Sequence, residues 1–312
     1  MKKYSFLIGL IIFVFIVTRL DFDKLLLVLI EINHLYFILG FLLLFPILIT
    51  KAYRWNYLKK KQNISYSLKD SFLMYGAGMY LGILTPGRLG EISKILYLKN
   101  DRYSIGKSSV GVILDRMSDL LFLLIFSYLG MFFFFSLFRD FILLLTFSLI
   151  FILILLIIFL RTNLIQLSFK KIFNLIVPLK YQKSWKLNFQ DFINDLKIYK
   201  SKDYLFISLI TVFSWLIYYL QMFFLAKSIN ITNIPFLYLS IAVAIAGLLT
   251  ILPISVLGMG TRDAVLILFF SIFLIPNETT VSFSMLILLM SVLMALIGLA
   301  CWLIKPIQIS NS

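Results

Sequence analysis

The chain has 312 residues, of which 62% are hydrophobic and 14% are charged. A soluble domain is about half apolar and about a quarter charged, so this composition excludes an ordinary soluble domain and indicates a polytopic membrane protein. The formal net charge of +15 fits basic loops that meet anionic lipid. No basic stretch belongs to a nucleic-acid-binding module, so we expect no nucleic-acid partner. With one cysteine, Cys301, and one histidine, His34, we expect no disulfide, no metal site and no cofactor.

A membrane-spanning helix needs about 20 mostly apolar residues. Six segments fit this length: 4–20, 35–57, 111–135, 141–160, 204–226 and 281–304. The first follows Lys2 and Lys3 and has no small-residue cleavage site after it, so we expect an uncleaved helix rather than a signal peptide.

Two further apolar segments, 71–98 and 236–275, are interrupted by helix-breaking and charged residues. Their glycines and prolines are Pro86, Gly87 and Gly90 in the first and Pro253, Gly258 and Gly260 in the second. Such interruptions survive in a bilayer only where they are buried in protein or line a cavity. A pair of them in corresponding positions of two halves is typical of the binding site of a transporter.

The charges of the loops predict which loops share a side of the membrane. Basic residues dominate three segments that we expect in the cytoplasm: 58–70, 99–110 and 161–203. We expect 21–34, 227–235 and 276–280 outside. Each interrupted segment then begins and ends on one side, which predicts a re-entrant hairpin, with Pro86 and Gly87 at the tip of the first.

The predicted fold is therefore an all-α polytopic membrane protein, with about six spanning helices and two re-entrant hairpins in an inverted-topology repeat. Residues 1–312 form a single membrane domain. Its parts are 4–34 (first helix and outer loop), 35–135 (first repeat), 141–203 (connecting helix and basic segment) and 204–304 (inverted second repeat). We expect a plasma-membrane location and both termini in the cytoplasm.

Two aromatic patterns concern the membrane surface. An apolar face at helical spacing, opposite lysines, predicts either an amphipathic helix on the inner leaflet or a linker helix packed on the bundle. It comprises Phe189, Phe192, Ile193, Leu196 and Tyr199. A second group predicts an interfacial belt with bases that extend to the surface: Tyr53, Trp55 and Tyr57 beside Lys51 and Arg54.

Ionisable side chains at membrane depth are usually functional or paired with one another. The candidates are Arg88, Glu91, Lys94, Asp115, Arg116, Asp119, Arg262 and Asp263. Asp115 and Asp119 share a helix face, whereas Arg116 points elsewhere, toward Glu91 or a ligand phosphate. Half-helices that begin near 88–92 and 261–264 would present their N-termini to an anionic headgroup. The alternative is internal salt bridging that only holds the hairpins in place.

Asp21 and Asp23 offer another alternative, because membrane glycosyltransferases that use lipid-linked sugars keep a carboxylate pair in the first outer loop. A turn with two acidic residues after a first helix is, however, ordinary.

Over roughly residues 5–305, these segments resemble the flippase-like membrane domain of the lysylphosphatidylglycerol synthase family. The resemblance rests on the stretches 86–91, 115–119 and 253–264 and on the Arg54-Trp55 end of the second helix. Family members typically have glutamate where this chain has Asp115 and Asp263, and a proline-glycine pair where it has Val256-Leu257. At both positions the negative charge needed for pairing is thus kept, on a side chain that is one methylene shorter.

The resemblance implies lipid translocation and not aminoacylation by this chain, since bifunctional members carry a C-terminal aminoacyl-transferring domain and this chain ends a few residues after its last helix. We expect the substrate, a phospholipid or lipid-linked glycan, to contact Arg88, Glu91, Arg116, Arg262 and Asp263. Asp115 and Asp119 would support them. The alternatives are a lipid-modifying transferase, or a non-catalytic partner of a separate lipid-modifying enzyme.

Overall fold

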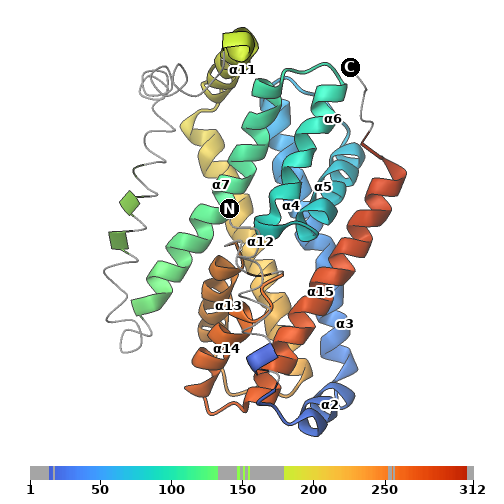
Figure 1. The fold of residues 1–312 in the computed structure, drawn as a ribbon, viewed down its shortest axis with the longest axis vertical. Helices are drawn as coiled ribbons and strands as arrows, with labels where there is room; N and C mark the ends of the chain where they lie inside the picture. The colour runs from blue at the N-terminus through green and yellow to red at the C-terminus, as the bar shows by residue number, and fades with distance from the viewer. Residues whose placement is uncertain are drawn as a thin grey trace.

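The computed structural model describes residues 14–16, 18–132, 146–147, 150–151, 154, 179–251, 255 and 257–307. All regular elements within these residues are helices (Figure 1). In chain order they are α2 (Phe22–Ile30), α3 (His34–Leu42), α4 (Leu44–Lys61), α5 (Leu68–Ile83), the 3-10 helix η1 (Pro86–Ser93), α6 (Lys94–Asn100), α7 (Ile105–Met131), α11 (Leu179–Leu196), α12 (Ser201–Ser228), α13 (Phe236–Ile251), α14 (Thr261–Ser271) and α15 (Asn277–Ile304). The prediction of an all-α membrane fold is confirmed.

Three helices in the described part of the chain are long and apolar enough to cross a membrane: His34–Lys61, Ser201–Ser228 and Asn277–Ile304. They correspond to the predicted segments 35–57, 204–226 and 281–304. Residues 111–131 of the predicted segment 111–135 lie in α7, which has 27 residues but carries Asp115, Arg116 and Asp119 in its centre. Most of the predicted segments 4–20 and 141–160 falls outside the described residues.

The first long helix is interrupted at Leu43, between α3 and α4. Pro46 is the cause, because it has no N–H to donate to the carbonyl of Leu42 in the preceding turn. The hydroxyl of Thr50 donates to the carbonyl of Pro46 at 2.8 Å, so one carbonyl next to the break is satisfied.

The two interrupted segments form compact helix pairs in opposite halves of the molecule (Figure 1). In one, α5 leads into η1 and α6 returns beside it; in the other, α13 is followed by α14. Chain reversal at the tips uses left-handed backbone, with φ of 63° at Gly87 and 79° at Gly258. A half-helix does begin at Thr261, as expected. The expectation of another from 88–92 is wrong, because this stretch is a kinked 3-10 helix and α6 begins at Lys94.

The two halves exchange packing partners. Helix α5 packs on α15, and α13 packs on α7, so each interrupted pair contacts the final long helix of the other half. Small residues permit the first crossing: a Cβ atom at Gly298 would lie 2.6 Å from the carbonyl oxygen of Gly76. The tips also meet, since a Cβ atom at Gly87 would lie 3.1 Å from the carbonyl oxygen of Ile251.

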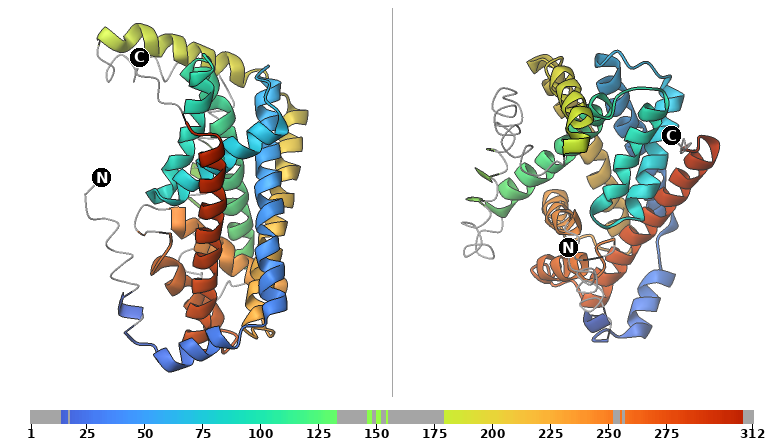
Figure 2. Two further views of the ribbon diagram at one scale, coloured as in Figure 1. Left: turned by 90° about the vertical axis from the view of Figure 1, so that its right-hand side faces the viewer. Right: turned by 45° about the horizontal axis from the view of Figure 1, so that its top comes forward.

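The loops separate by charge between the two ends of the molecule. At one end Lys305 pairs with Asp70 at 2.5 Å, and Gln62 donates to Asp195 at 2.7 Å. The basic segments 58–70, 99–110 and 179–203 meet there, and α11 lies across this end of the bundle (Figure 2). The segments 21–34, 227–235 and 276–280 meet at the opposite end, where the backbone N–H of Asn33 donates to the carbonyl of Ser228 at 2.8 Å.

The apolar face at the end of α11 packs on the bundle rather than facing lipid. Leu196 and Tyr199 are 3% and 6% exposed and lie in a cluster with Leu58, Val110 and Ile207. The Tyr199 hydroxyl donates to the carbonyl of Leu58 at 2.8 Å. Of the two predicted alternatives, an amphipathic helix on the inner leaflet and a linker helix packed on the bundle, these residues fit the second.

Candidate functional site

A buried network of ion pairs connects α4, α6 and α7, and hydrogen bonds extend it to α12. Its centre is Arg54, whose side chain is 0% exposed. The Nε atom of Arg54 donates to Asp115 at 2.8 Å, and Nη1 donates to Asp119 at 3.0 Å and to the hydroxyl of Thr211 at 2.7 Å. Asp115 and Asp119 therefore share one face of α7, as their spacing predicts.

Lys51 completes this side of the network. Its Nζ atom donates to Asp119 at 2.8 Å, and the indole N–H of Trp215 donates to the same carboxylate at 3.1 Å. The predicted interfacial belt with extended bases is wrong for Lys51, Arg54 and Trp55, which are 9%, 0% and 0% exposed. Both bases turn inward because carboxylates on α7 are available to pair with them.

The other side of the network reaches the first interrupted pair. Lys94 on α6 donates to Asp115 at 3.0 Å and lies 3.6 Å from Glu91, while the hydroxyl of Tyr75 donates to Asp115 at 3.1 Å. Glu91 is 1% exposed and accepts a hydrogen bond from Arg116. Glu91 is thus the group that Arg116 meets within the protein, and the shared carboxylates connect η1 to α7.

The second tip has a smaller polar arrangement. Arg262 donates through Nε to the hydroxyl of Ser284 at 2.6 Å and through Nη1 to the carbonyl of Leu257 at 3.3 Å. Asp263 accepts from the backbone N–H of Gly260 at 2.7 Å and from the Ser284 hydroxyl. Asp263 thereby caps α14, so that the positive end of this helix already faces a carboxylate of its own chain.

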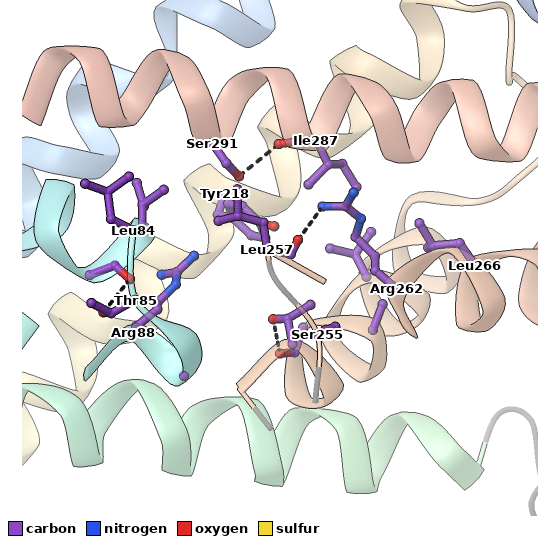
Figure 3. Close-up of a pocket in the computed structure, with 17 residues that line it drawn as sticks. Leu84, Thr85, Arg88, Tyr218, Ser255, Leu257, Arg262, Leu266, Ile287 and Ser291 are labelled. Carbon is purple, nitrogen blue, oxygen red and sulfur yellow. Dashed lines mark hydrogen bonds between the residues drawn. The ribbon is translucent and has the colours of Figure 1, made fainter. Parts of the chain in front are cut away.

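A cavity of about 320 Å³ lies between the two tips. Arg88 and Arg262 enter it from opposite sides, and Tyr218 of α12 lies between them (Figure 3). A neighbouring cavity of about 190 Å³ shares Arg88 and Tyr218 and extends to Lys51, Arg116 and Asp119. The two cavities adjoin each other along the ion-pair network, and their walls combine these charged groups with apolar side chains.

Arg88 differs from the other cations around the cavities. Its side chain is exposed to the cavity, and it forms no ion pair or side-chain hydrogen bond with any described residue. Its backbone has φ of 57°, because the chain reverses at Gly87 and Arg88. A guanidinium held at a tip without a carboxylate partner is suited to form two parallel hydrogen bonds with a phosphate or carboxylate of a ligand.

The predicted site residues thus separate into two groups. Arg88, Arg116, Arg262 and Asp119 line the cavities, whereas Glu91, Asp115 and Asp263 lie behind them in contact with cations or the backbone.

The tip glycines have steric roles. A Cβ atom at Gly90 would lie 2.1 Å from the carbonyl oxygen of Leu81, and one at Gly258 would lie 2.4 Å from Cγ2 of Thr250. Gly260 has φ of 80°. Pro253 lies outside the described residues, and Pro86 is described only as the first residue of η1.

Lys51 and Arg54 are members of the network that the sequence assigned to an interfacial belt. Lys94 joins the network through internal pairing, which is the alternative to a ligand site. Lys51 and Arg54 are three residues apart in an apolar segment, a spacing that places both on one helix face and is the available signal. Their pairing with residues more than sixty positions later depends on how α4 and α7 are aligned.

Asp21 and Asp23 do not converge on a site. Asp21 caps α2 by accepting from the backbone N–H groups of Asp23 and Lys24 at 3.1 and 3.3 Å. The Lys24 backbone hydrogen bond is the main cause that lowers the pKa of Asp21. This is an ordinary helix start, and the glycosyltransferase alternative gains no support from it.

Comparisons with known proteins agree with this architecture. The chain is 27% identical to the UPF0104 membrane protein MJ1595 of Methanocaldococcus jannaschii, over 95% of this chain and 92% of that protein. No solved structure matches the chain. Residues 4–298 match the family described as the lysylphosphatidylglycerol synthase TM region. The chain therefore belongs to the lysylphosphatidylglycerol synthase transmembrane-region family.

Proposed function

We propose that this membrane protein is a lipid translocase, which binds the phosphate of a lipid headgroup between its two interrupted helix pairs and carries it between leaflets. The observation that carries the proposal is the pair Arg88 and Arg262, contributed by different halves of the chain to one cavity. Ligand pockets are about 300–1,000 Å³. A cavity of about 320 Å³ accommodates a headgroup, while the acyl chains stay in the bilayer.

The proposal includes a topology. The interrupted pairs would be re-entrant hairpins of an inverted repeat, since each pair occupies one half of the molecule and packs on the last long helix of the other half. The end that carries the basic loops would face the cytoplasm of the plasma membrane. A separate lipid-modifying enzyme would then act as partner by supplying or consuming the transported lipid.

The test is lipid scrambling in proteoliposomes that contain acyl-labelled phospholipids. Wild type is compared with Arg88→Gln and Arg262→Gln, and Arg102→Gln is the matched control. Arg102 is also exposed and has a left-handed backbone conformation, with φ of 67°, but it lies in the loop after α6. We expect movement by wild type and the control, and a loss of roughly tenfold or more in the cavity variants. Folded wild-type protein that moves no lipid would refute the proposal, and equal rates in all four proteins would refute this site.

A further inference from the structure

The carboxylates around the cavity already form hydrogen bonds or ion pairs with other groups of the protein. Asp119 is the acidic residue among the described residues that line either cavity. One of its oxygens accepts from Lys51 at 2.8 Å, and the other accepts from Arg54 at 3.0 Å and Trp215 at 3.1 Å. Glu91 and Asp263, which lie behind the walls, hold Arg116 and the start of α14. A positively charged group in the cavity would therefore find no carboxylate available.

The formal charge of the walls is positive. Lys51, Arg88, Arg116 and Arg262 line the two cavities, with Asp119 as the lining carboxylate. Lys51 pairs with Asp119, Arg116 with Glu91, and Arg262 with Asp263 at 3.9 Å, so the unpaired charge among the described lining residues is the guanidinium of Arg88. Such a low-dielectric cleft concentrates anions and repels cations.

The neutral polar groups of the cavity add a second requirement. The hydroxyls of Thr250 and Ser291 donate to the helix carbonyls of Gly247 and Ile287 at 2.7 and 3.0 Å. While each hydroxyl donates to its helix carbonyl, its lone pairs are free to accept a hydrogen bond from a ligand. Tyr218 lines both cavities and makes no side-chain hydrogen bond with described residues, so its hydroxyl is available. These acceptors suit hydroxyl groups of a headgroup.

We infer that the lipid carried is a net-anionic phospholipid whose headgroup bears hydroxyls and no ammonium group, such as a glycerol or sugar phosphate. This inference rests on the proposed function and narrows its substrate class. The phosphate lies against Arg88 and Arg262, and the hydroxyls of the headgroup donate to Thr250 and Ser291. A lysylated headgroup is rejected, because its ammonium groups meet an excess of positive charge and no open carboxylate.

The experiment compares acyl-labelled phosphatidylglycerol with lysyl-phosphatidylglycerol and phosphatidylcholine, in scrambling and in binding to the detergent-solubilised full chain. We expect phosphatidylglycerol to be preferred over the lysyl lipid by roughly tenfold or more in both measurements. Binding preference without movement would support the inferred headgroup and refute translocation. Equal binding and equal movement of the two lipids would overturn the inference and leave translocation intact.

A variant with reversed charge at Arg88 provides a second, independent test of the headgroup preference. Arg88→Glu places a carboxylate in the cavity without removing any internal ion pair, since Arg88 has none with the described residues. We expect the ratio of phosphatidylglycerol to lysyl-phosphatidylglycerol binding to fall by roughly tenfold or more, while Arg102→Glu leaves the ratio unchanged. An unchanged ratio in Arg88→Glu would also overturn the inference.

Discussion

Arg54 and Asp115 form an ion pair from which water is excluded: Nε and Nη2 of Arg54 lie 2.8 and 2.7 Å from the same carboxylate oxygen, and both side chains are 0% exposed. Buried pairs of this kind are costly to form and very costly to break, because removal of one partner leaves the other charged and unpaired. The pair fixes α4 against α7 and thereby positions the wall that carries Lys51, Arg116 and Asp119.

The first prediction concerns this pair. Arg54→Leu leaves Asp115 without its guanidinium partner and removes one partner of Asp119, so we expect unfolding to become easier by about 3–5 kcal/mol. Thermal and denaturant unfolding in detergent measure this decrease in the free energy of unfolding. Lys60→Ala, at an exposed position of the same helix, is the control and should alter stability little. If the two variants are equally stable, Arg54 does not stabilise the bundle as described.

The second prediction concerns the close approach inside the first interrupted pair. Gly90→Ala would place a Cβ atom 2.1 Å from the carbonyl oxygen of Leu81, so η1 must move away from α5. We expect a loss of about 1–3 kcal/mol in stability and a displaced Arg88. Gly247→Ala is the matched control, because its Cβ atom would lie 3.9 Å from the nearest side-chain atom, Cδ2 of Leu123. Equal stability of the two variants in unfolding would contradict this packing.

The third prediction concerns Glu91 as the residue that positions Arg116. A double-mutant cycle with Glu91→Gln and Arg116→Gln should give a coupling energy of about 0.5–3 kcal/mol in unfolding, since the two side chains are in direct contact. Additive effects would show that the contact contributes nothing to stability. A parallel cycle of Glu91→Gln with Lys60→Ala tests whether the coupling is specific.

The fourth prediction concerns pH. Burial raises the pKa of Asp195, although the hydrogen bond from Gln62 opposes the shift. Because its pKa is higher in the folded state, the contribution of Asp195 is most favourable below its unfolded pKa of about 4 and is lost as the pH rises. Asp195→Asn keeps an oxygen acceptor for Gln62 and has no charge to bury.

We therefore expect Asp195→Asn to exceed wild type in melting temperature at pH 7 and to approach it near pH 4. Asp23→Asn, at an exposed position at the opposite end of the molecule, is the control for the loss of one formal charge. A difference between Asp195→Asn and wild type that does not change with pH would contradict the assigned burial effect.

The interrupted segments are predictable from sequence because proline and glycine inside apolar stretches have few structural solutions in a membrane protein. The residues around Pro86 and Gly258 consequently lie at chain reversals, close to their expected positions. Loop charge likewise separates the two ends of the molecule, since each loop carries its own signal. These features depend on local residues, and local patterns are sufficient to predict them.

The ion-pair network is not predictable in the same way. Lys51 and Arg54 are compatible with extension toward a membrane surface and with pairing in the interior, and the choice depends on the alignment of α4 with α7. The kinked path of η1 also depends on contacts beyond its own sequence, because Gly87 approaches the end of α13. Lys94 is paired with Asp115, in line with the internal salt bridging that is the alternative for the charged residues of this segment.

The exchange of partners between the two halves has a consequence for biogenesis. Helix α5 leaves the ribosome about two hundred residues before α15, the helix that covers Gly76. Until α15 is inserted, the first interrupted pair has no permanent neighbour along that face, and its polar tip must be sheltered by the translocation machinery or by lipid headgroups. Truncation within α15 is therefore expected to expose the beginning of the chain to quality-control proteases, far from the position of the cut.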